Sequence, residues 1–404
     1  MKISENWLRT WVNPAIDSEK LSDQLTMLGL EVDDLSPAAK PFTGVVVGEV
    51  LTVEQHPDAD RLRVTTVNIG SGEPLQIVCG APNVRAGMKA PVATIGAVLP
   101  GDFKIKKGKL RGIESQGMLC GASEIDLEDK IDGLLELPND APVGVNIREY
   151  LDLDDNVIDI SITPNRGDCF SIRGIAREIG VINQLPVTVP EIKEVAATIA
   201  DEKKVVVETE GCPRYLGRVI KNVNTKAPTP EWMERALVRA GIRQHSILVD
   251  ITNYVLMELG QPLHAFDGGK VQGSVHVRQA KAGEKLVLLN EQEVELQDDV
   301  MVIADDEKAL AIAGIMGGLS SSVTDETTEI FLESAFFAPL HIAGRARRFG
   351  LHTDASQRYE RGVDFELPLI AMHRASQLIA ELAGGEFGPI IVAEKPELLP
   401  KREA

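Results

Sequence analysis

The sequence is poor in cysteine, in long hydrophobic runs and in positive charge. Its cysteines lie far apart and form no Cys-x-x-Cys pair, so we do not expect a zinc site. No run reaches the roughly 18 apolar residues of a membrane span, and the N-terminal residues lack the apolar stretch of a signal peptide. We therefore expect a cytoplasmic protein with reduced thiols and no membrane partner. The cysteines are Cys79, Cys120, Cys169 and Cys212.

Negative charge dominates the composition, because 61 aspartate and glutamate residues outnumber 42 lysine and arginine residues and give a formal net charge of −19. Such a balance argues against a protein that coats nucleic acid nonspecifically, although local basic patches are compatible with it. With 404 residues the chain is too long for one core, and we expect roughly two to four domains. The 44% hydrophobic and 25% charged residues are typical of soluble globular proteins.

The order of patterns predicts helical and then β-rich segments in the first half of the chain. Two short helices come first, and Asp17 or Ser18 is the expected N-cap of the second. Strand-like runs between residues 44 and 99, separated by glycine and proline, predict a small barrel or sandwich. From Ser171 a helix with apolar residues on one face follows.

A larger mixed unit is predicted from Lys203 onward. One of its strands is expected at residues 285–290, and Thr229 is the expected cap of a helix that has Pro230 at its first position. A final helix is predicted over residues 367–382. No closing element is apparent after it, so we expect a further domain to follow.

Arginine is concentrated in one segment, residues 344–364. Five arginines surround a His-Thr-Asp-Ala-Ser core at residues 352–356, in a protein whose net charge is strongly negative. Because the guanidinium fork matches phosphate oxygens, this cluster predicts a site for an anion. The five are Arg345, Arg347, Arg348, Arg358 and Arg361.

A second basic run lies at residues 101–112, where five positive side chains accompany a single acid, Asp102. On a small barrel such a run can contact the phosphate backbone of a nucleic acid. The alternative is a solvated hairpin, which a charge run viewed alone favours. The basic residues are Lys104, Lys106, Lys107, Lys109 and Arg111.

Polar residues crowd the stretch VDITNYVLMELGQPLHAFD at residues 249–267. A single histidine such as His264 most often has a structural role, and one histidine with two distant carboxylates is weak evidence for a metal site. The density of polar groups, Asn253 among them, instead indicates a pocket that binds a ribose or an amino acid. These interpretations stay open on the residues alone.

Two further blocks carry candidate site residues. The run AIAGIMGGLSSSV (311–323) lacks the spacing of a phosphate-binding P-loop, and its small residues permit either close approach of a ligand or tight packing of a strand against a helix. In EIFLESAFF (329–337), Glu333 lies near aromatic residues, where its carboxylate can accept a hydrogen bond from a buried phenol. An exposed strand position is the alternative for Glu333.

In their order along the chain, these blocks resemble the N-terminal half of the bacterial-type phenylalanyl-tRNA synthetase beta subunit. Within residues 42–148, HPDADRL, IVCGAPNV and GMLCGASE also resemble the tRNA-binding OB domain of synthetase-associated proteins. The other matching blocks are MKISENWLRTWV, TPNRGDCFSIRGIARE, CPRYLGRVI, VDITNYVLMELGQPLHAFD, IMGG and GRARRFGLHTDASQRYERGVD.

This resemblance implies an α+β multidomain fold. It implies a small helical domain at residues 1–41 and 149–200, interrupted by an OB-fold β-barrel at 42–148 and followed by a larger α+β editing domain at 201–390, while residues 391–404 would begin a missing domain. The implied partners are tRNA(Phe) and the alpha subunit, in an assembly of two alpha and two beta chains. ATP and magnesium are implied for the full enzyme and no cofactor or metal for this segment.

The resemblance also implies an editing activity, the hydrolysis of tyrosine wrongly attached to tRNA(Phe). The physical need is clear, because an apolar phenylalanine pocket rejects an isostere with one added hydroxyl only poorly, by a factor of about 10² by analogy. With no activated serine or cysteine nucleophile apparent, we expect direct attack by a positioned water, without a covalent intermediate.

Individual roles follow from the same resemblance. Glu333 is implied to accept the tyrosyl hydroxyl, and His264 to lie beside the ester. Arg243 would hold the tRNA end, and the pocket would be completed by Gly317, Thr353 and Ala355, while Asn253 is a further candidate for binding substrate. The expected tRNA contacts are the basic run at 101–112 together with Arg345, Arg347 and Arg348. The alternative function is a noncatalytic tRNA-binding and scaffolding segment that needs the alpha subunit and the rest of the beta subunit.

Overall fold

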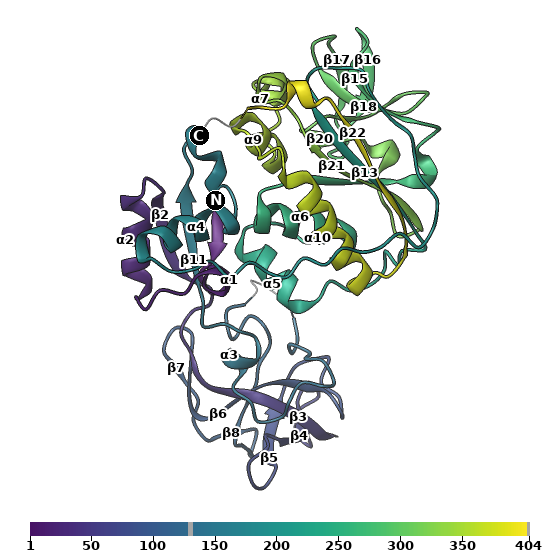
Figure 1. The fold of residues 1–404 in the computed structure, drawn as a ribbon. Coiled ribbons are helices and arrows are strands. Elements are labelled where there is room, and N and C mark those ends of the chain that lie inside the picture. The colour runs from purple at the N-terminus through teal and green to yellow at the C-terminus, as the bar shows by residue number, and fades with distance from the viewer. Residues whose placement is uncertain (128–131, 402–404) are drawn as a thin grey trace. The chain divides into compact units, whose positions relative to one another are not determined.

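The structure, a computed structural model, describes residues 1–127 and 132–401. The described residues form both helices and strands, which confirms the mixed α and β composition expected from the sequence. The chain forms two compact units, one of Ser36–Asn156 and one that joins Met1–Leu35 to the chain from Val157 onward (Figure 1). In these described residues, no helix has both the length and the apolar character needed to cross a membrane.

The larger unit begins with a three-stranded sheet. Strand β1 (Lys2–Ser4) pairs antiparallel with β11 (Asn156–Ser161), which in turn pairs with β2 (Glu31–Pro37). Asp17 accepts a hydrogen bond from the Lys20 backbone amide at 2.8 Å, which confirms it as a helix cap. The helices of this part are α1 (Glu5–Trp11), α2 (Ser18–Met27), the 3₁₀ helix η1 (Pro164–Cys169) and α4 (Ile172–Asn183).

The smaller unit is built on one antiparallel sheet in the order β10-β6-β3-β4-β5, and β7 pairs with the C-terminal end of β6. The Gln116 backbone amide donates to the Gln76 carbonyl at 2.8 Å, so the residue before β10 lies beside β5. Alternate residues such as Val45 and Val47 fill the core. The elements are β3 (Thr43–Gln55), β4 (Arg63–Asn68), β5 (Leu75–Cys79), β6 (Lys89–Leu99), β7 (Phe103–Lys104), β8 (Gly108–Leu110), β9 (Ile113–Ser115), β10 (Gly117–Leu119) and α3 (Ile147–Tyr150).

The two compact units agree with one predicted domain and do not separate the other two. The smaller unit encloses the β-rich region predicted at 42–148. The helical domain and the domain at 201–390, predicted as separate, both fall within the larger unit, so a boundary near residue 200 stays a prediction.

The larger unit continues with a long mixed segment. Its elements are β12 (Val205–Val207), β13 (Arg214–Lys221), α5 (Glu231–Arg239), α6 (Ile247–Leu259), β14 (Leu263–Asp267), η2 (Gly268–Lys270), β15 (Val275–Gln279), β16 (Glu284–Val287), β17 (Glu293–Leu296), β18 (Met301–Ala304), β19 (Ala309–Ile312), β20 (Met316–Gly317), η3 (Leu319–Ser321), β21 (Glu329–Phe336), α7 (Pro339–Ile342), α8 (Arg345–Arg348), α9 (Asp354–Arg361), α10 (Leu367–Leu382), β22 (Glu386–Glu394) and η4 (Pro396–Leu398).

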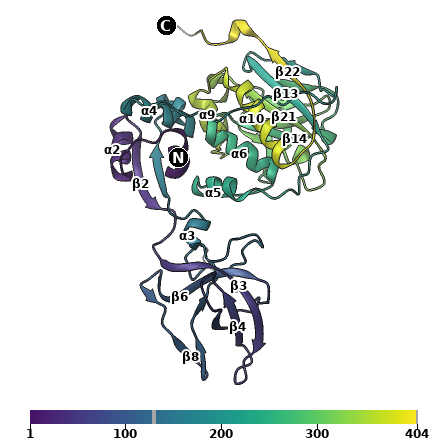
Figure 2. The same cartoon turned by 60° about the horizontal axis from the view of Figure 1, so that its bottom comes forward.

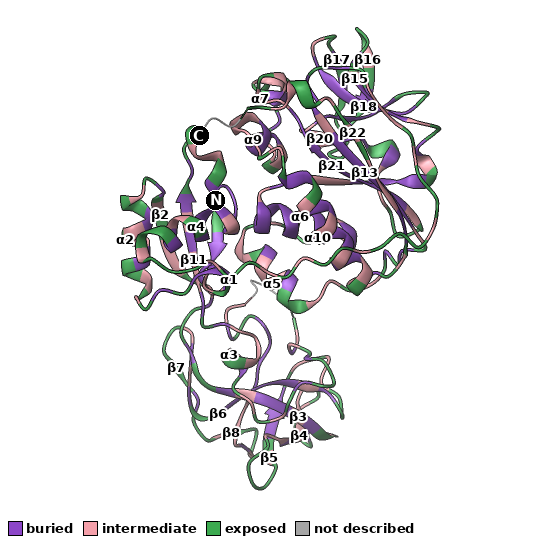
Figure 3. Cartoon of the chain, in the orientation of Figure 1, coloured by how far each residue is buried: buried purple, intermediate pink, exposed green. Residues whose placement is uncertain are grey.

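Two sheets and two helices form the layers of this segment. The antiparallel sheet β14-β21-β13-β22 carries α6 and α10 side by side on one face (Figures 1 and 2). The sheet β12-β15-β18-β19-β20 shares a core with its other face. Figure 3 shows α6 buried along most of its length, because β14, α10, α5 and α4 all pack against it. This helix is therefore apolar on nearly all sides.

Residues of β21 alternate between the two faces of the first sheet. Leu332 packs toward the helices, and the Ser334 hydroxyl donates to the Pro368 carbonyl of α10 at 2.8 Å. Phe331 and Ala335 instead join the core between the two sheets. Because side chains alternate along a strand, Glu333 points into that same layer, where a carboxylate is unusual.

Two local predictions for this segment are wrong. Thr229 does not cap α5, because Pro230 occupies the N-cap position and the Thr229 hydroxyl donates to Asp250 Oδ2 at 2.6 Å. The strand predicted at 285–290 ends at Val287. A turn follows it, in which the Leu288 backbone amide donates to the Gln292 carbonyl. In both cases a contact distant in sequence or a turn overrides the local pattern, whereas the bounds predicted for α10 are confirmed.

Candidate functional site

Strand pairing places His264 and Glu333 side by side. In the four-stranded sheet, His264 of β14 is the direct partner of Glu333 of β21. Directly paired residues of antiparallel strands project from the same face, with Cβ atoms about 4.5–5.5 Å apart. The pair Phe266 and Phe331, two positions away along the same strands, enters the core between the sheets. The imidazole and the carboxylate therefore open onto the same layer.

A cavity of about 430 Å³ adjoins these two side chains, a size typical of pockets for small ligands. It is bounded by α6, β14, β20, β21 and the N-terminal end of α9. Arg243, which is predicted to hold the tRNA end, is exposed and does not line the cavity, so its role stays a prediction. The other predicted pocket residues all line it, namely His264, Glu333, Asn253, Gly317, Thr353 and Ala355.

Glu333 is buried, with 6% of its surface exposed, so the alternative of an exposed strand position is wrong. Its Oε2 accepts a hydrogen bond from the Tyr215 hydroxyl at 2.7 Å. No other hydrogen bond to this carboxylate occurs within the described residues, which leaves Oε1 without a protein donor. Burial raises the pKa of Glu333 to about 7, and the hydrogen bond from Tyr215 opposes that rise. Near neutral pH the carboxyl group is close to its titration midpoint.

The His264 ring is held by packing. It is half-buried, stands edge-on to Phe266 with ring centroids 4.4 Å apart, and its Nε2 is covered without a hydrogen-bond partner among the described residues. Burial lowers the pKa of His264 to about 4, so the imidazole is neutral near pH 7. A histidine with an unpaired, covered ring nitrogen is costly, which argues against a purely structural role.

The small residues at 311–323 serve both roles considered from the sequence, the close approach of a ligand and tight packing. A Cβ atom at Gly317 would lie 2.5 Å from His264 Cε1, so only glycine admits the ring at this position. A Cβ atom at Gly318 would lie 2.5 Å from the Leu310 carbonyl oxygen. Gly317 therefore keeps the cavity open beside the histidine, whereas Gly318 permits close packing.

The acids near His264 in the sequence do not join it in a metal site. Asp250 accepts hydrogen bonds from the Thr229 hydroxyl and the His245 backbone amide, at 2.6 and 2.9 Å. Asp267 accepts one from the Thr327 hydroxyl at 2.7 Å. Both carboxylates thus fix local backbone structure. Elsewhere in the described residues, the one group of three or more possible ligands with their atoms within 4.8 Å of one another is Asp168, Cys169 and Glu178.

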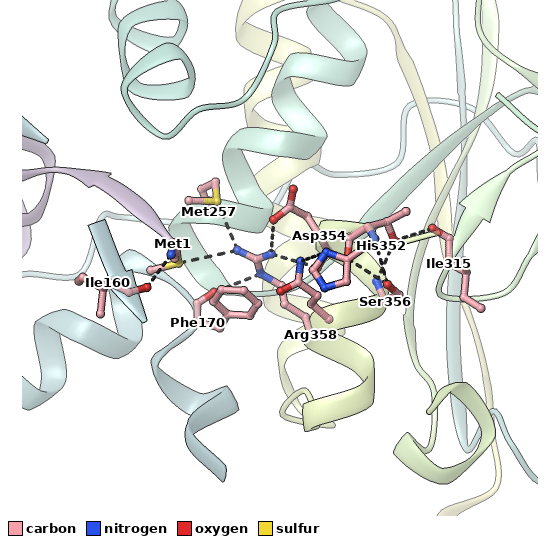
Figure 4. Close-up of polar contacts among 11 residues, drawn as sticks. Met1, Ile160, Phe170, Met257, Ile315, His352, Asp354, Ser356 and Arg358 are labelled. Atoms are coloured by element: carbon pink, nitrogen blue, oxygen red, sulfur yellow. Dashed lines mark hydrogen bonds and ion pairs between the residues drawn. The ribbon is translucent and has the colours of Figure 1, made fainter. Parts of the chain in front are cut away.

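The N-terminal end of α9 forms one wall of the cavity. The Thr353 side chain caps this helix, and its hydroxyl donates to the Ile315 carbonyl at 2.9 Å. Arg358 anchors the helix one turn further on (Figure 4). Its buried guanidinium donates to the Phe170 carbonyl at 3.1 Å and to the Asp354 carboxylate at 3.1 Å, and lies 4.2 Å from the centre of the Phe170 ring. Arg358 thus fixes the wall against the N-terminal part of the unit.

Comparisons with known proteins give this geometry a context. A B3/4 domain model matches residues 211–384, which include the cavity, and a putative tRNA binding domain model matches residues 45–146. The phenylalanine–tRNA ligase beta subunit of Acinetobacter baylyi is 81% identical over 404 residues, which are 100% of this chain and 51% of that protein. The chain belongs to the phenylalanine–tRNA ligase beta-subunit family. This confirms the resemblance inferred from the sequence blocks.

The chain spans about half the length of the beta subunits that it matches. The phenylalanine–tRNA ligase beta subunit of Psychrobacter arcticus is 64% identical over 409 residues, with 100% of this chain and 51% of that protein covered. A solved N-terminal fragment of the beta subunit from Pyrococcus horikoshii is 15% identical, with 60% of this chain and 68% of that chain covered. Its TM-score of 0.32 is too low to support a conclusion.

In this beta-subunit segment, the basic run at 101–112 contains β7 and β8, and its last residues form the turn between β8 and β9. Its five basic side chains, Lys104, Lys106, Lys107, Lys109 and Arg111, are exposed. Lys107 pairs with Glu114 at 2.8 Å, across the hairpin. This exposure fits both alternatives, so the contact of the run with tRNA stays a prediction.

The arginine segment does not form one anion site, because two of its five members face inward. Arg358 is 2% exposed, and both Arg358 and Arg361 lie over the Phe170 ring. Arg348 forms a bidentate pair with Asp299, with both distances 2.7 Å, and Arg345 lies 3.7 Å from the same carboxylate. The role predicted for Arg345, Arg347 and Arg348 in binding tRNA stays a prediction.

Several residues of the site were not predicted from the sequence. Tyr215, which bonds to Glu333, lies 118 positions away from it in the chain. A tyrosine inside the apolar strand RYLGRVIK is a signal of a polar site, because the chain has only four tyrosines. Its hydrogen-bond partner could not be predicted, because the pairing of β13 with β21 determines it. The other missed residues at the cavity are His245, His352, Asp354 and Tyr359.

Proposed function

We propose that this chain forms the tRNA-binding and editing part of a phenylalanine–tRNA ligase beta subunit. It binds tRNA(Phe) and hydrolyses tyrosine wrongly attached to that tRNA. The observation that carries the proposal is the cavity in which a buried carboxylate, Glu333, and a neutral imidazole, His264, adjoin each other beside Gly317. Membership of the family supports the nature of the substrate.

Glu333 provides the selection between the two amino acids. Its Oε1 has no donor within the described residues and accepts the hydroxyl of a bound tyrosyl group. A phenylalanyl group would cover this oxygen without bonding to it, which is unfavourable in a site of low polarity. Sites built to bond a hydroxyl discriminate against the analogue lacking it by about 10⁴–10⁵, far more than an apolar pocket achieves.

Hydrolysis requires a water molecule beside the ester. The water oxygen forms a bond to the carbonyl carbon, the bond between that carbon and the ribose oxygen breaks, and a proton passes from the water to the departing ribose oxygen. The products are free tyrosine and uncharged tRNA. No covalent link to the protein is needed, because holding the water and the ester in the reactive geometry lowers the barrier by itself.

His264 orients these reactants and is a poor general base. With a pKa of about 4, its neutral imidazole accepts a proton only weakly near pH 7. A hydrogen bond from the ring to the water or the ester is within its capacity, since the ring makes none within the described protein. Its edge-on contact with Phe266 keeps the ring in place.

The smaller unit supplies tRNA affinity in this proposal. Its sheet order and the family model for tRNA binding support an OB-type domain, whose exposed basic run at 101–112 contacts the phosphate backbone. The complete enzyme, with the alpha subunit in the cytoplasm, uses ATP and magnesium for aminoacylation. Arg243, outside the cavity but two residues from His245 at its edge, contacts the end of the tRNA.

The decisive experiment measures deacylation of Tyr-tRNA(Phe) and Phe-tRNA(Phe) by the chain alone. We expect hydrolysis of the tyrosyl form, and Glu333→Ala should lower it about 10- to 150-fold and reduce the preference for tyrosine. His264→Ala should lower the rate with a smaller effect on preference. Glu295→Ala, at an exposed strand position, is the matched control.

A chain that binds tRNA(Phe) without deacylating it would instead be the noncatalytic, scaffolding segment. Thermal melts of each variant exclude loss of folding as the cause of a lower rate. Full tyrosine preference in Glu333→Ala would show that another group reads the hydroxyl.

A further inference from the structure

Tyr215 holds one oxygen of the Glu333 carboxylate. Its hydroxyl donates to Oε2 at 2.7 Å, and the two residues are 0% and 6% exposed. The register of the sheet explains this contact, because Gly217 of β13 is the direct partner of Glu333 and Tyr215 lies two residues away on the same face. A side chain at Gly217 would collide with the Phe331 ring. Glycine at this position thus leaves room for the Phe331 ring.

We infer that Tyr215 is a positioning residue for amino-acid selection, which fixes Glu333 through Oε2 so that Oε1 remains the acceptor for a substrate hydroxyl. The inference rests on the proposed editing function. A phenol has one proton to donate, and Tyr215 directs it to the carboxylate. Without that bond, the Glu333 side chain would be free to turn within the cavity and to lose its ionised form.

The groups around Glu333 provide no cation within the described residues. Cys212 and Tyr215 approach from the side of β13, His264 from β14 and Tyr359 from α9, and burial keeps all four neutral near pH 7. The hydrogen bond from Tyr215 is thus the contact that favours the ionised carboxyl group over the neutral one. The remaining titratable residues of the cavity are His245, His352 and Asp354.

Selection should therefore depend on pH. Burial raises the pKa of Glu333 to about 7, so the carboxylate becomes protonated as the pH falls through that value. The preference for tyrosine, which needs a strong acceptor, should fall with it. Since the bond from Tyr215 favours the anion, Tyr215→Phe should move the midpoint of this change to higher pH, by about one pH unit or more.

The test measures hydrolysis of Tyr-tRNA(Phe) and Phe-tRNA(Phe) from about pH 5.5 to 8.5 and reports the ratio of the two rates. At pH 7 we expect Tyr215→Phe to lower this ratio about 10-fold, with the loss recovered at higher pH. Tyr254→Phe is the matched control, because Tyr254 is another buried tyrosine beside a glutamate, Glu258, outside the cavity. Its profile should follow that of the wild type.

The outcomes separate this inference from the proposed function. A wild-type chain that hydrolyses neither substrate at any pH overturns both. A wild-type chain that prefers tyrosine, with Tyr215→Phe giving the same ratio and midpoint, overturns the inference alone. A drop in the Tyr215→Phe ratio by the same factor at every pH, with an unchanged midpoint, also overturns it, because the bond from Tyr215 would then not favour the ionised carboxylate.

A second measurement covers the case in which Tyr215→Phe does not fold. The wild-type chain is produced with 3-fluorotyrosine at its four tyrosines. The more acidic phenol strengthens the bond to Glu333, so the midpoint of the rate ratio should move to lower pH. The same protein carrying Tyr254→Phe should show an equal displacement, and an unchanged midpoint would overturn the inference.

Discussion

Replacing Gly317 by alanine should close the cavity from inside. The added Cβ atom would lie 2.5 Å from Cε1 and 2.7 Å from Nε2 of His264, and 3.2 Å from Leu289 Cδ1. The ring cannot simply withdraw, because Phe266 stands edge-on to it with centroids 4.4 Å apart. It must instead turn toward the space that a substrate would occupy.

The size of the effect follows from this geometry. To reach an ordinary contact distance, the ring must move by about 1 Å, and overpacking of this kind costs about 1–3 kcal/mol of folding stability. At about 2–4 °C per kcal/mol, the melting temperature should fall by roughly 2–12 °C. Displacing a group beside the reacting bond by about 1 Å lowers a rate by about 100-fold.

The assay follows single-turnover deacylation of Tyr-tRNA(Phe) together with a thermal melt. Gly269→Ala is the matched control, since a Cβ atom there would meet its nearest neighbour, Asp267 Oδ1, at an ordinary 3.4 Å. We expect the control to behave as wild type in both measurements. If Gly317→Ala melted with the wild type and deacylated at the same rate, the closeness of Gly317 to His264 would have no functional meaning.

Three further predictions concern stability, its dependence on pH and the binding of tRNA. Glu258→Ala should destabilise the chain to urea by about 3–5 kcal/mol, because Arg374 would lose its bonds of 2.8 and 3.0 Å to a buried carboxylate. Between about pH 4.5 and 6.5 the raised pKa of Glu333 lowers stability as pH rises, while the depressed pKa of His264 raises it. Urea unfolding across this window should show a steeper rise of stability with pH in Glu333→Gln and a flatter one in His264→Asn. Replacing the lysines of residues 101–112 by alanine should lower the log–log salt slope of tRNA binding by roughly 0.7–0.9 per lost phosphate contact, and an unchanged slope would exclude such contacts.

Local sequence rules predicted those features that depend on neighbours along the chain. The cap at Asp17 and the bounds of α10 follow from side-chain chemistry and helical periodicity. Thr229 shows the limit of such rules, because its hydroxyl bonds to Asp250, 21 positions away, and leaves the cap position to Pro230. A propensity describes what a segment prefers in isolation, and tertiary partners change the outcome.

In the candidate site, too, several residues could be predicted from the sequence, whereas their contacts could not. His264 and Glu333 were found from unusual polar residues and from the family resemblance, but their adjacency depends on the register of β14 and β21. The bond from Tyr215 spans 118 positions and has no local signal. Arg358 was predicted to belong to an anion site, but it is buried in the fold. A guanidinium can bind an internal aromatic ring and a backbone carbonyl as well as a phosphate, and the sequence does not distinguish these partners.

The energetic cost of the site is itself an argument that it binds something. A glutamate whose pKa is about 7 instead of 4.5 destabilises the folded chain by about 3 kcal/mol at pH values above 7. His264 adds a covered nitrogen with no hydrogen-bond partner in the described protein. Apolar residues at these two paired strand positions would avoid both penalties and fill the layer between the sheets. Two such costly polar side chains therefore favour a ligand that forms hydrogen bonds with them, as the proposed tyrosyl group would.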